Sequence, residues 1–272
     1  MSYSFDGKTA LITGAASGIG AALAHKLADR GCNLALADLN GEGVTAVAQS
    51  LKSNARVVTA HILDLADASA IAALPDEIAG SHAGVDILFN NAGAALGGAF
   101  ADVKPEDFEW LIDVNFYSVV RMTRAFLPAL LASPDARLIN VSSVFGLIGP
   151  PGQTAYAASK FAVRGFTEAL RQELAQENVM VHTVFPGGVK TNIARNARIN
   201  LEDMSKVEEG VKAAEANLIT TPEQAAETIL RGVKRGNSRI LIGRDARLIS
   251  LLERITPTGA TRIVMKLKGS KP

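Results

Sequence analysis

Tyr156 and Lys160 stand four residues apart in the segment YAASK, and Ser143 precedes the tyrosine by thirteen residues. Four residues make about one turn of a helix, so the phenol and the amine project side by side from one face. A neighbouring ammonium favours the phenolate, which makes the tyrosine a usable proton acceptor near neutral pH. Such a pair also occurs on many helices as an exposed contact without chemistry, so its surroundings decide between the two interpretations.

The segments around Tyr156 and Lys160 favour a catalytic role for the pair. Ser142 and Ser143 end a predicted strand, and a short linker rich in Gly and Pro (146–153) leads to the helix with Tyr156. Such a linker can fold the helix back until the tyrosine faces a serine hydroxyl. That hydroxyl could donate a hydrogen bond to a substrate oxygen while Tyr156 exchanges a proton with it. The segment therefore predicts proton transfer on an alcohol or ketone.

A glycine-rich turn, TGAASGIG (13–20), lies between a predicted strand and a predicted helix. Glycines let the backbone approach a pyrophosphate, and the helix N-terminus adds partial positive charge. The spacing GxxxGxG differs from the commonest dinucleotide fingerprint, and a turn of this kind can be purely structural. Asp38, 20 residues after Gly18, favours cofactor binding, because a carboxylate there can bond the ribose hydroxyls. The alternative is an ordinary surface aspartate.

The same aspartate bears on which dinucleotide binds. A carboxylate at Asp38 would repel a 2′-phosphate, and neither Ser17 nor Leu39 is basic. We therefore expect NAD, with NADP as the alternative. Asp64, after the third predicted strand, could lie under an adenine or cap the next helix. The segment NNAG (90–93) could satisfy backbone groups where strands separate, contact the cofactor, or do both.

Short aliphatic runs alternate with helical segments along the chain. The predicted strands are Thr9–Thr13, Asn33–Ala37, Arg56–His61, Asp86–Asn90, Arg137–Ser142, Met180–Val184 and Arg239–Ile242. The predicted helices are Ile19–Arg30, Gly43–Ser53, Ala68–Ala79, Phe108–Leu131, Thr154–Glu177 and Pro222–Arg235. Nearly continuous apolar strands are typical of parallel sheets covered on both faces. The alternation predicts an α/β fold, a Rossmann-type doubly wound parallel sheet of about seven strands, as a single domain over 1–243.

The composition excludes several classes of protein. Of 272 residues, 48% are hydrophobic and 20% charged, as in a globular protein. A net charge of +1 argues against a nucleic-acid-binding surface. Cys32 is the single cysteine and the four histidines show no ligand spacing, so we expect no metal. The sequence has no signal-peptide pattern and no apolar run of about 18 residues, so we expect a cytoplasmic protein without a transmembrane segment.

Two further segments differ from the rest. Residues 192–220 are polar and rich in small side chains, which predicts a lid over the site. The tail, 244–272, carries seven Lys or Arg, and its Leu248, Leu251, Leu252 and Ile255 follow helical spacing. This tail could pack on its own subunit or over a neighbour's site, lie on an anionic membrane surface, or be disordered.

Taken together, residues 6–243 resemble the short-chain dehydrogenase/reductase family. The shared motifs are TGAASGIG (13–20), NNAG (90–93), Asn115 in DVNFYS, the serine of VSS, YAASK (156–160) and PGGVKT (186–191). The resemblance implies that Ser143 holds the substrate oxygen, that Tyr156 is the proton donor or acceptor, and that Lys160 lowers its pKa and binds the nicotinamide ribose. It also implies that Asn115 anchors a water joining Lys160 to solvent.

The resemblance further implies a set of cofactor contacts. They are Gly14, Ser17, Gly18, Ile19, Gly20, Asp38, Asp64, Asn91, Ala92, Gly93, Tyr156, Lys160, Pro186, Gly187, Val189 and Thr191. The substrate would contact Ser143, Phe145, Gln153 and Tyr156. The family also forms dimers or tetramers, through helices corresponding to 108–131 and 154–177, although an apolar stripe there could equally face the protein's own sheet.

The expected reaction is hydride transfer between NAD(H) and an uncharged, fairly apolar alcohol or ketone. The expected walls of the pocket include Phe145, Leu147 and Ile148, with few charges. Arg195 and Arg198 in the lid could meet an anionic group or simply face solvent. The alternatives are an NADPH-dependent ketoreductase and a non-catalytic dinucleotide-sensing protein. The complete set of Ser, Tyr, Lys and Asn favours an enzyme.

Overall fold

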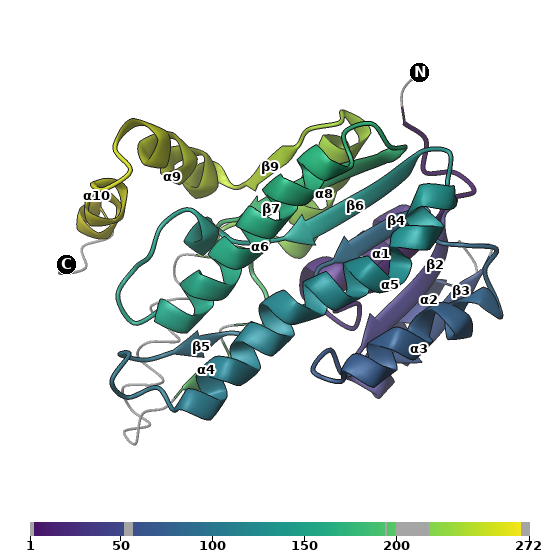
Figure 1. Ribbon diagram of the computed structural model, residues 1–272, viewed down its shortest axis with the longest axis horizontal. Helices are drawn as coiled ribbons and strands as arrows, with labels where there is room; N and C mark the ends of the chain where they lie inside the picture. The colour runs from purple at the N-terminus through teal and green to yellow at the C-terminus, as the bar shows by residue number, and fades with distance from the viewer. Residues whose placement is uncertain (1–2, 52–56, 194, 200–217, 268–272) are drawn as a thin grey trace.

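The computed structural model describes residues 3–51, 57–193, 195–199 and 218–267. Seven parallel strands form one sheet in the order β3-β2-β1-β4-β6-β7-β9 (Figure 1). Their bounds are Thr9–Thr13 (β1), Asn33–Asp38 (β2), Val58–Ile62 (β3), Ile87–Asn90 (β4), Ala136–Val141 (β6), Val179–Pro186 (β7) and Arg239–Ile242 (β9). This confirms the predicted doubly wound sheet in a single α/β domain.

Helices cover both faces of the sheet, which explains why the strands are apolar throughout. Helices α1 (Gly18–Ala28), α2 (Gly41–Leu51) and α8 (Pro222–Lys234) pack in one cluster with the sheet. On the other face, α3 (Ala68–Ala79), α5 (Ser118–Ala132) and α6 (Thr154–Glu173) form a second cluster. Every residue of β1, β4 and β6 is buried. The sheet is therefore a rigid platform with its carboxyl edge available for a site.

The strand order reverses between β1 and β4, where crossovers leave in opposite directions. The gap is held by Thr13, whose hydroxyl donates to the Phe89 carbonyl at 3.2 Å and accepts from the Asn91 and Ala92 N–H groups at 3.0 and 3.1 Å. The Asn91 amide donates to the Thr13 carbonyl at 2.9 Å. Loops on the two sides of the gap are thus fixed where ligands bind in folds of this kind.

The predicted helix Phe108–Leu131 contains an irregularity that the sequence did not reveal. Helix α4 (Pro105–Ile112) is followed by a π-helical turn, η1 (Asp113–Tyr117), before α5 begins. Such turns are rare and occur often at functional sites. Asn115 lies in this turn and is fully buried. The predicted helix Thr154–Glu177 ends earlier, as α6, at Glu173.

The first part of the tail is helical, as α9 (Arg244–Ile255) and α10 (Ala260–Leu267). The two helices extend beyond β9 at one end of the molecule (Figure 1, yellow). Ala246 and Ile249 of α9 and Ala260 and Val264 of α10 are buried in one cluster with the turn 144–148 and Phe185. The described part of the tail therefore packs on its own chain.

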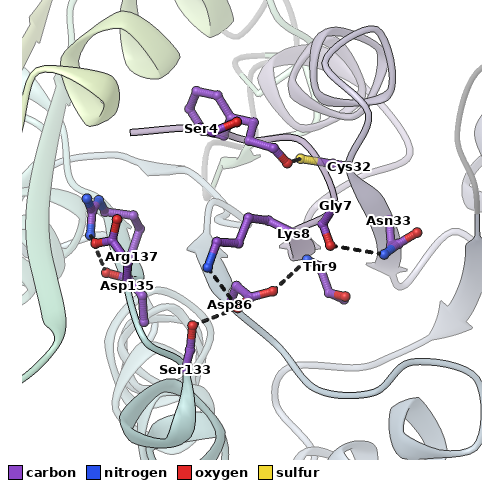
Figure 2. A network of polar contacts seen from close by, with 12 residues as sticks. Ser4, Gly7, Lys8, Thr9, Cys32, Asn33, Asp86, Ser133, Asp135 and Arg137 are labelled. Atoms are coloured by element: carbon purple, nitrogen blue, oxygen red, sulfur yellow. Dashed lines mark hydrogen bonds and ion pairs between the residues drawn. The ribbon is translucent and has the colours of Figure 1, made fainter. Parts of the chain in front are cut away.

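A polar network fastens the opposite, amino edge of the sheet (Figure 2). The Asp86 carboxylate accepts from the Thr9 N–H at 2.9 Å, from the Ser133 hydroxyl at 2.6 Å and from the Lys8 ammonium at 3.3 Å. Nearby, Arg137 pairs with Asp135. These contacts join the start of β1 to β4 and to the end of α5, far along the strands from the site described below.

Little of the predicted lid falls within the described residues, because 194 and 200–217 lie outside them. A two-residue strand, β8 (Arg198–Ile199), pairs in parallel with β5 (Leu96–Gly97). Beyond it, Val189 bridges to Thr220, just before α8. Among the described residues, none of the helices has the length and apolar character that crossing a bilayer requires.

Candidate active site

A cavity of about 560 Å³ opens at the carboxyl edge of the sheet. The sequence-predicted residues that line it are Gly14, Ser17, Gly18, Ile19, Asp38, Asp64, Asn91, Ala92, Gly93, Ser143, Tyr156, Lys160, Pro186, Gly187, Val189 and Thr191. Six predicted residues do not line it: Gly20, Asn115, Phe145, Gln153, and also Leu147 and Ile148, which are buried against α9 and α10 instead. The fold thus brings most of the predicted set to one hollow.

The glycine turn forms one wall of this cavity. Gly14 and Gly18 have φ of +68° and +54°, which L side chains rarely adopt. Ser17 is the N-cap of α1, yet its side chain makes no cap hydrogen bond. Gly20 has a packing role instead, because a Cβ there would lie 2.0 Å from the Gly14 carbonyl oxygen. The turn leaves N–H groups and a helix N-terminus facing the cavity, which suits an anion.

Two aspartates line the cavity at the ends of neighbouring strands. The Asp38 carboxylate accepts from the Ala16 and Asn40 N–H groups, each at 2.9 Å, which fixes it beside the glycine turn. Asp64 accepts from the Ala66 N–H at 2.8 Å. The helix cap considered for Asp64 is made by Asp67, which accepts from the first N–H groups of α3. Asp64 is therefore a turn residue with its side chain at the cavity.

The adjacent serines 142 and 143 have different partners. The Ser142 hydroxyl donates to the Lys160 carbonyl at 2.8 Å and so ties α6 to the end of β6. The Ser143 hydroxyl accepts from the Phe145 N–H at 3.1 Å and lies near the Tyr156 phenol, whose pKa it lowers against the effect of burial. Both serines line the cavity, but the Ser142 hydroxyl is used within the backbone framework, so Ser143 is the serine whose hydroxyl acts on Tyr156.

Burial controls the ionisation of Tyr156 and Lys160. It raises the pKa of Tyr156, against a smaller lowering by the nearby Ser143 hydroxyl. It lowers the pKa of Lys160 to about 8, because the residue is only 3% exposed and the charged form loses its contact with water. The ammonium donates to the Val141 carbonyl at 3.3 Å. The expected lowering of the Tyr156 pKa by Lys160 is therefore not the dominant effect; the amine lies 5.7 Å from the ring centroid.

Asn115 fixes the segment after β4 to α6 by hydrogen bonds of its side chain. Its side chain accepts from the Ala94 N–H at 2.8 Å, donates to the Ala94 carbonyl at 3.0 Å, and donates to the Ser159 hydroxyl at 3.1 Å. A Cβ on Gly93 would lie 3.1 Å from the Asn115 oxygen and 3.2 Å from the Lys160 amine. The space beside Gly93 is therefore bordered by both the Asn115 oxygen and the Lys160 amine. The water expected between them stays a prediction.

The neighbouring Asn90 has a structural position. Its amide nitrogen donates to Asn140 at 2.8 Å and to Thr123 at 3.2 Å, so it links β4 to β6 and α5. Asn90 does not line the cavity, whereas Asn91 does. The structural alternative considered for the NNAG segment therefore applies to Asn90, whereas the cofactor contact of Asn91 stays a prediction.

The loop after β7 lines the cavity, and a residue of the tail holds this loop in place. The Gly188 N–H donates to the Asp245 carboxylate at 2.7 Å. A Cβ on Gly187 would lie 2.2 Å from both oxygens of that carboxylate, so only glycine fits there. This role could not be predicted from the sequence, where Asp245 is one acidic residue among the basic residues of the tail.

The sequence also missed Trp110, which lines the cavity from α4. The Arg198 guanidinium lies 3.5 Å from the centre of its indole ring and pairs with Asp107 at 2.8 Å. The charge of Arg198 is thus partnered, although the residue lines the cavity. Phe145 packs edge-to-face on Tyr156, with ring centres 6.1 Å apart, and Gln153 lies near Gly97.

Comparison with known proteins identifies the family. Residues 8–202 match the short chain dehydrogenase family. The chain belongs to the short-chain dehydrogenase/reductase family. It is 43% identical over 264 residues to "Putative oxidoreductase SadH" of Mycobacterium tuberculosis, covering 96% of this chain and 95% of that protein. It is thus an oxidoreductase of this family.

Two solved structures of the family resemble the fold closely. A short-chain dehydrogenase/reductase from Burkholderia phymatum in complex with NAD has a TM-score of 0.83 and 28% identity, over 93% of this chain and 96% of that one. A short-chain dehydrogenase from Sphingobium yanoikuyae in complex with NADPH has a TM-score of 0.75 and 27% identity, over 95% of each chain. The two neighbours therefore bind different dinucleotides.

The residues present fit a dinucleotide by their own chemistry. The helix N-terminus and the glycines with positive φ can hold a pyrophosphate, and a fixed carboxylate from Asp38 stands at the end of β2. At the other end lie Tyr156, Lys160 and the loop 186–191. Among the described residues, no cluster of His, Cys, Asp and Glu could hold a metal ion.

Proposed function

We propose that this protein transfers a hydride between NAD(H) and an uncharged, fairly apolar alcohol or ketone. The observation that carries the proposal is the position of Ser143 and Tyr156 at one cavity, with the buried Lys160 on the same helix as the tyrosine. The Ser143 hydroxyl donates to the substrate oxygen and Tyr156 exchanges a proton with it. The nicotinamide, when bound, supplies or accepts the hydride.

The ionisation of the two buried groups suits this role. Because burial raises the pKa of Tyr156, the phenol is neutral near pH 7 and can donate its proton to a ketone oxygen. Lys160, with a pKa of about 8, is still mostly protonated at pH 7. Its positive charge then stabilises the phenolate that forms in ketone reduction or that accepts a proton in alcohol oxidation. Asn115 holds the backbone of Ala94 beside this pair.

The NAD preference is supported by Asp38. Its carboxylate is fixed by two N–H groups at the cavity, and its neighbour Leu39, which also lines the cavity, is not basic. A 2′-phosphate brought to this point would meet a negative charge, and neither Ser17 nor Leu39 beside it supplies a cation. Initial rates with NADH and NADPH on the same ketone test this preference. A higher kcat/KM with NADPH would contradict it and would favour the ketoreductase alternative.

The apolar substrate class is supported by the side chains around Tyr156. Trp110 and Ile193 line the cavity, and the charge of Arg198 is already paired with Asp107. A panel of aliphatic, alicyclic, aromatic and steroid-like alcohols and ketones, with one sugar phosphate as a charged comparison, tests this class. Turnover of the sugar phosphate in preference to all the apolar compounds would contradict it.

The role of Tyr156 can be tested by removing its hydroxyl. Tyr156→Phe keeps the ring and its contact with Phe145 but removes the proton donor, so we expect unchanged NAD affinity and a loss of turnover of at least about 100-fold. Tyr117→Phe is the matched control, because that ring is half exposed and does not line the cavity. A Tyr156→Phe variant that keeps a tenth of wild-type turnover would count against the role.

We also propose that the protein is a homodimer or homotetramer assembled through η1, α5 and α6. Tyr117, Leu131 and Phe161 on these elements are between 40 and 48% exposed. Large apolar side chains that protrude from adjacent helices are typical of buried oligomer interfaces. Analytical ultracentrifugation of the wild type and of Phe161→Asp tests this assembly; a monomeric wild type would contradict it.

A further inference from the structure

Helices α9 and α10 present an exposed surface of unusual composition. Their exposed residues are Arg244, Arg247, Leu248, Leu251, Arg254, Ile255, Arg262, Ile263, Lys266 and Leu267. Each of them is either a cation or a large aliphatic side chain. Ile255 and Leu267 are 71 and 69% exposed. Surface helices of soluble proteins normally carry acidic or neutral polar residues at many of these positions.

The acidic residues of the same helices point toward the protein. The Asp245 carboxylate accepts from the Gly188 N–H, and Glu253 pairs with Arg164 of α6 at 3.3 Å. The outer surface of the two helices therefore has positive charge that no acidic side chain of α9 or α10 offsets. Lys268 and Lys271, which follow in the sequence, add two more cations near this end of the chain.

The exposed residues of α9 share one face. At 3.6 residues per turn, the six exposed positions from Arg244 to Ile255 fall within an arc of about 120°. The opposite face carries the buried Ala246, Ile249 and Ser250. The two helices project beyond β9 at one end of the molecule (Figure 1).

We propose that the α9–α10 face, defined by these ten exposed residues, docks on an anionic lipid bilayer. Aliphatic side chains flanked by Arg and Lys are the pattern of helices that lie in the bilayer interface. The leucines and isoleucines enter the acyl boundary while the cations stay at the negatively charged headgroups. A second copy of the chain fits this face less well, because a two-fold contact would bring like charges together.

The docking face is physically coupled to the cavity. The buried side of α9 and α10 packs on Val144, Leu147 and Ile148, directly after Ser143, and Asp245 holds the loop at Gly188. A bilayer under this face would therefore contact helices that pack on the residues next to Ser143. Lipid docking does not depend on the reaction, so its test is separate from the test of the proposed function.

The experiment is co-sedimentation of the full-length protein with vesicles of phosphatidylcholine alone and of phosphatidylcholine mixed with phosphatidylserine. We expect pelleting with the phosphatidylserine vesicles, and less pelleting at high salt because salt screens the attraction. Arg247→Gln/Arg254→Gln should lower the partition coefficient about 25-fold, as expected when each lost cation contributes about fivefold. Ile255→Ser should lower it as well.

Matched controls test whether vesicle binding needs this face or only exposed cations and apolar side chains anywhere on the protein. Arg231→Gln/Arg235→Gln removes two exposed cations from the end of α8, and Ile62→Ser removes an aliphatic side chain that is as exposed as Ile255. Both controls should pellet like the wild type. The proposal is overturned if the wild type stays in the supernatant with both vesicles, or if the α9 variants pellet like their controls. A change of oligomeric state in the α9 variants without any vesicle effect would overturn it in favour of a self-interface.

Discussion

Asp245 allows a sharp test of how the tail supports the cavity. Asp245→Ala removes the acceptor of the Gly188 N–H, now 2.7 Å from the carboxylate. A hydrogen bond to a charged group contributes about 1.5–3 kcal/mol, so the free energy of unfolding should fall by about that amount. The loop 186–191 should also lose order. If binding must then fix one more residue, at about 1–2 kcal/mol, NAD affinity should fall about five- to thirtyfold.

Gly187 provides the second half of the test. In the wild type, Gly187→Ala would put a Cβ 2.2 Å from both Asp245 oxygens, and this overpacking should cost about 1–3 kcal/mol. In the Asp245→Ala background the carboxylate is gone, so Gly187→Ala should cost much less. The double-mutant cycle should therefore show a coupling of about 1–3 kcal/mol.

The assay is urea denaturation of the four proteins, together with NAD binding by calorimetry. Asp245→Asn keeps an acceptor for Gly188 and should recover part of the loss. Glu253→Ala removes the other tail carboxylate, which pairs with Arg164 away from the loop, and should leave NAD affinity unchanged. Additive effects of the Asp245 and Gly187 substitutions, or an Asp245→Ala variant as stable as the wild type, would refute the reasoning.

Three further predictions follow from other contacts. Lys160→Met should raise the free energy of unfolding at pH 7 without NAD by up to about 3 kcal/mol, because burial lowers the Lys160 pKa from 10.5 to about 8. The stability of the wild type should rise between pH 8 and 10.5, where only the unfolded chain keeps this proton. Urea titrations across this pH range should find no such rise in the variant. Asp38→Ala/Leu39→Arg should shift the ratio of kcat/KM for NADPH over NADH upward by at least about tenfold, because a guanidinium replaces a repelling carboxylate. Asp86→Ala should lower the free energy of unfolding by about 2–4 kcal/mol, because it leaves the Thr9 N–H and the Ser133 hydroxyl without their acceptor. It should leave kcat unchanged.

The sheet could be predicted from the sequence because its signal is local and repeated. Each strand is an apolar run bounded by a helix, and the alternation allows few topologies other than parallel crossovers. The carboxyl edge follows from that topology, so residues after the strands, such as Asp38, Asn91 and Ser143, were expected near one another. Their positions at one cavity need no long-range information beyond the strand order.

The parts that could not be predicted depend on contacts between distant segments. The π-helical turn that carries Asn115 has no local signature, because the sequence there fits an ordinary helix equally well. Trp110 reaches the cavity only because α4 crosses near α6, and its Arg198 partner comes from a segment 88 residues later in the chain. The expected effect of Lys160 on Tyr156 overlooked burial, which acts on both groups in the opposite direction to the charge pairing.

The tail illustrates why periodicity alone does not fix the buried face of a helix. Leu248, Leu251 and Ile255 form a stripe that could have faced the protein, yet they are exposed while Ala246 and Ile249 are buried. The small Ala246 allows α9 to approach the turn after Ser143, which a leucine would prevent. The acidic residues carry the missing information: each has an internal N–H or guanidinium partner, so the face that bears them must turn inward. The leucine and arginine face is left outside, and only a surface that accepts both apolar and cationic groups can cover it.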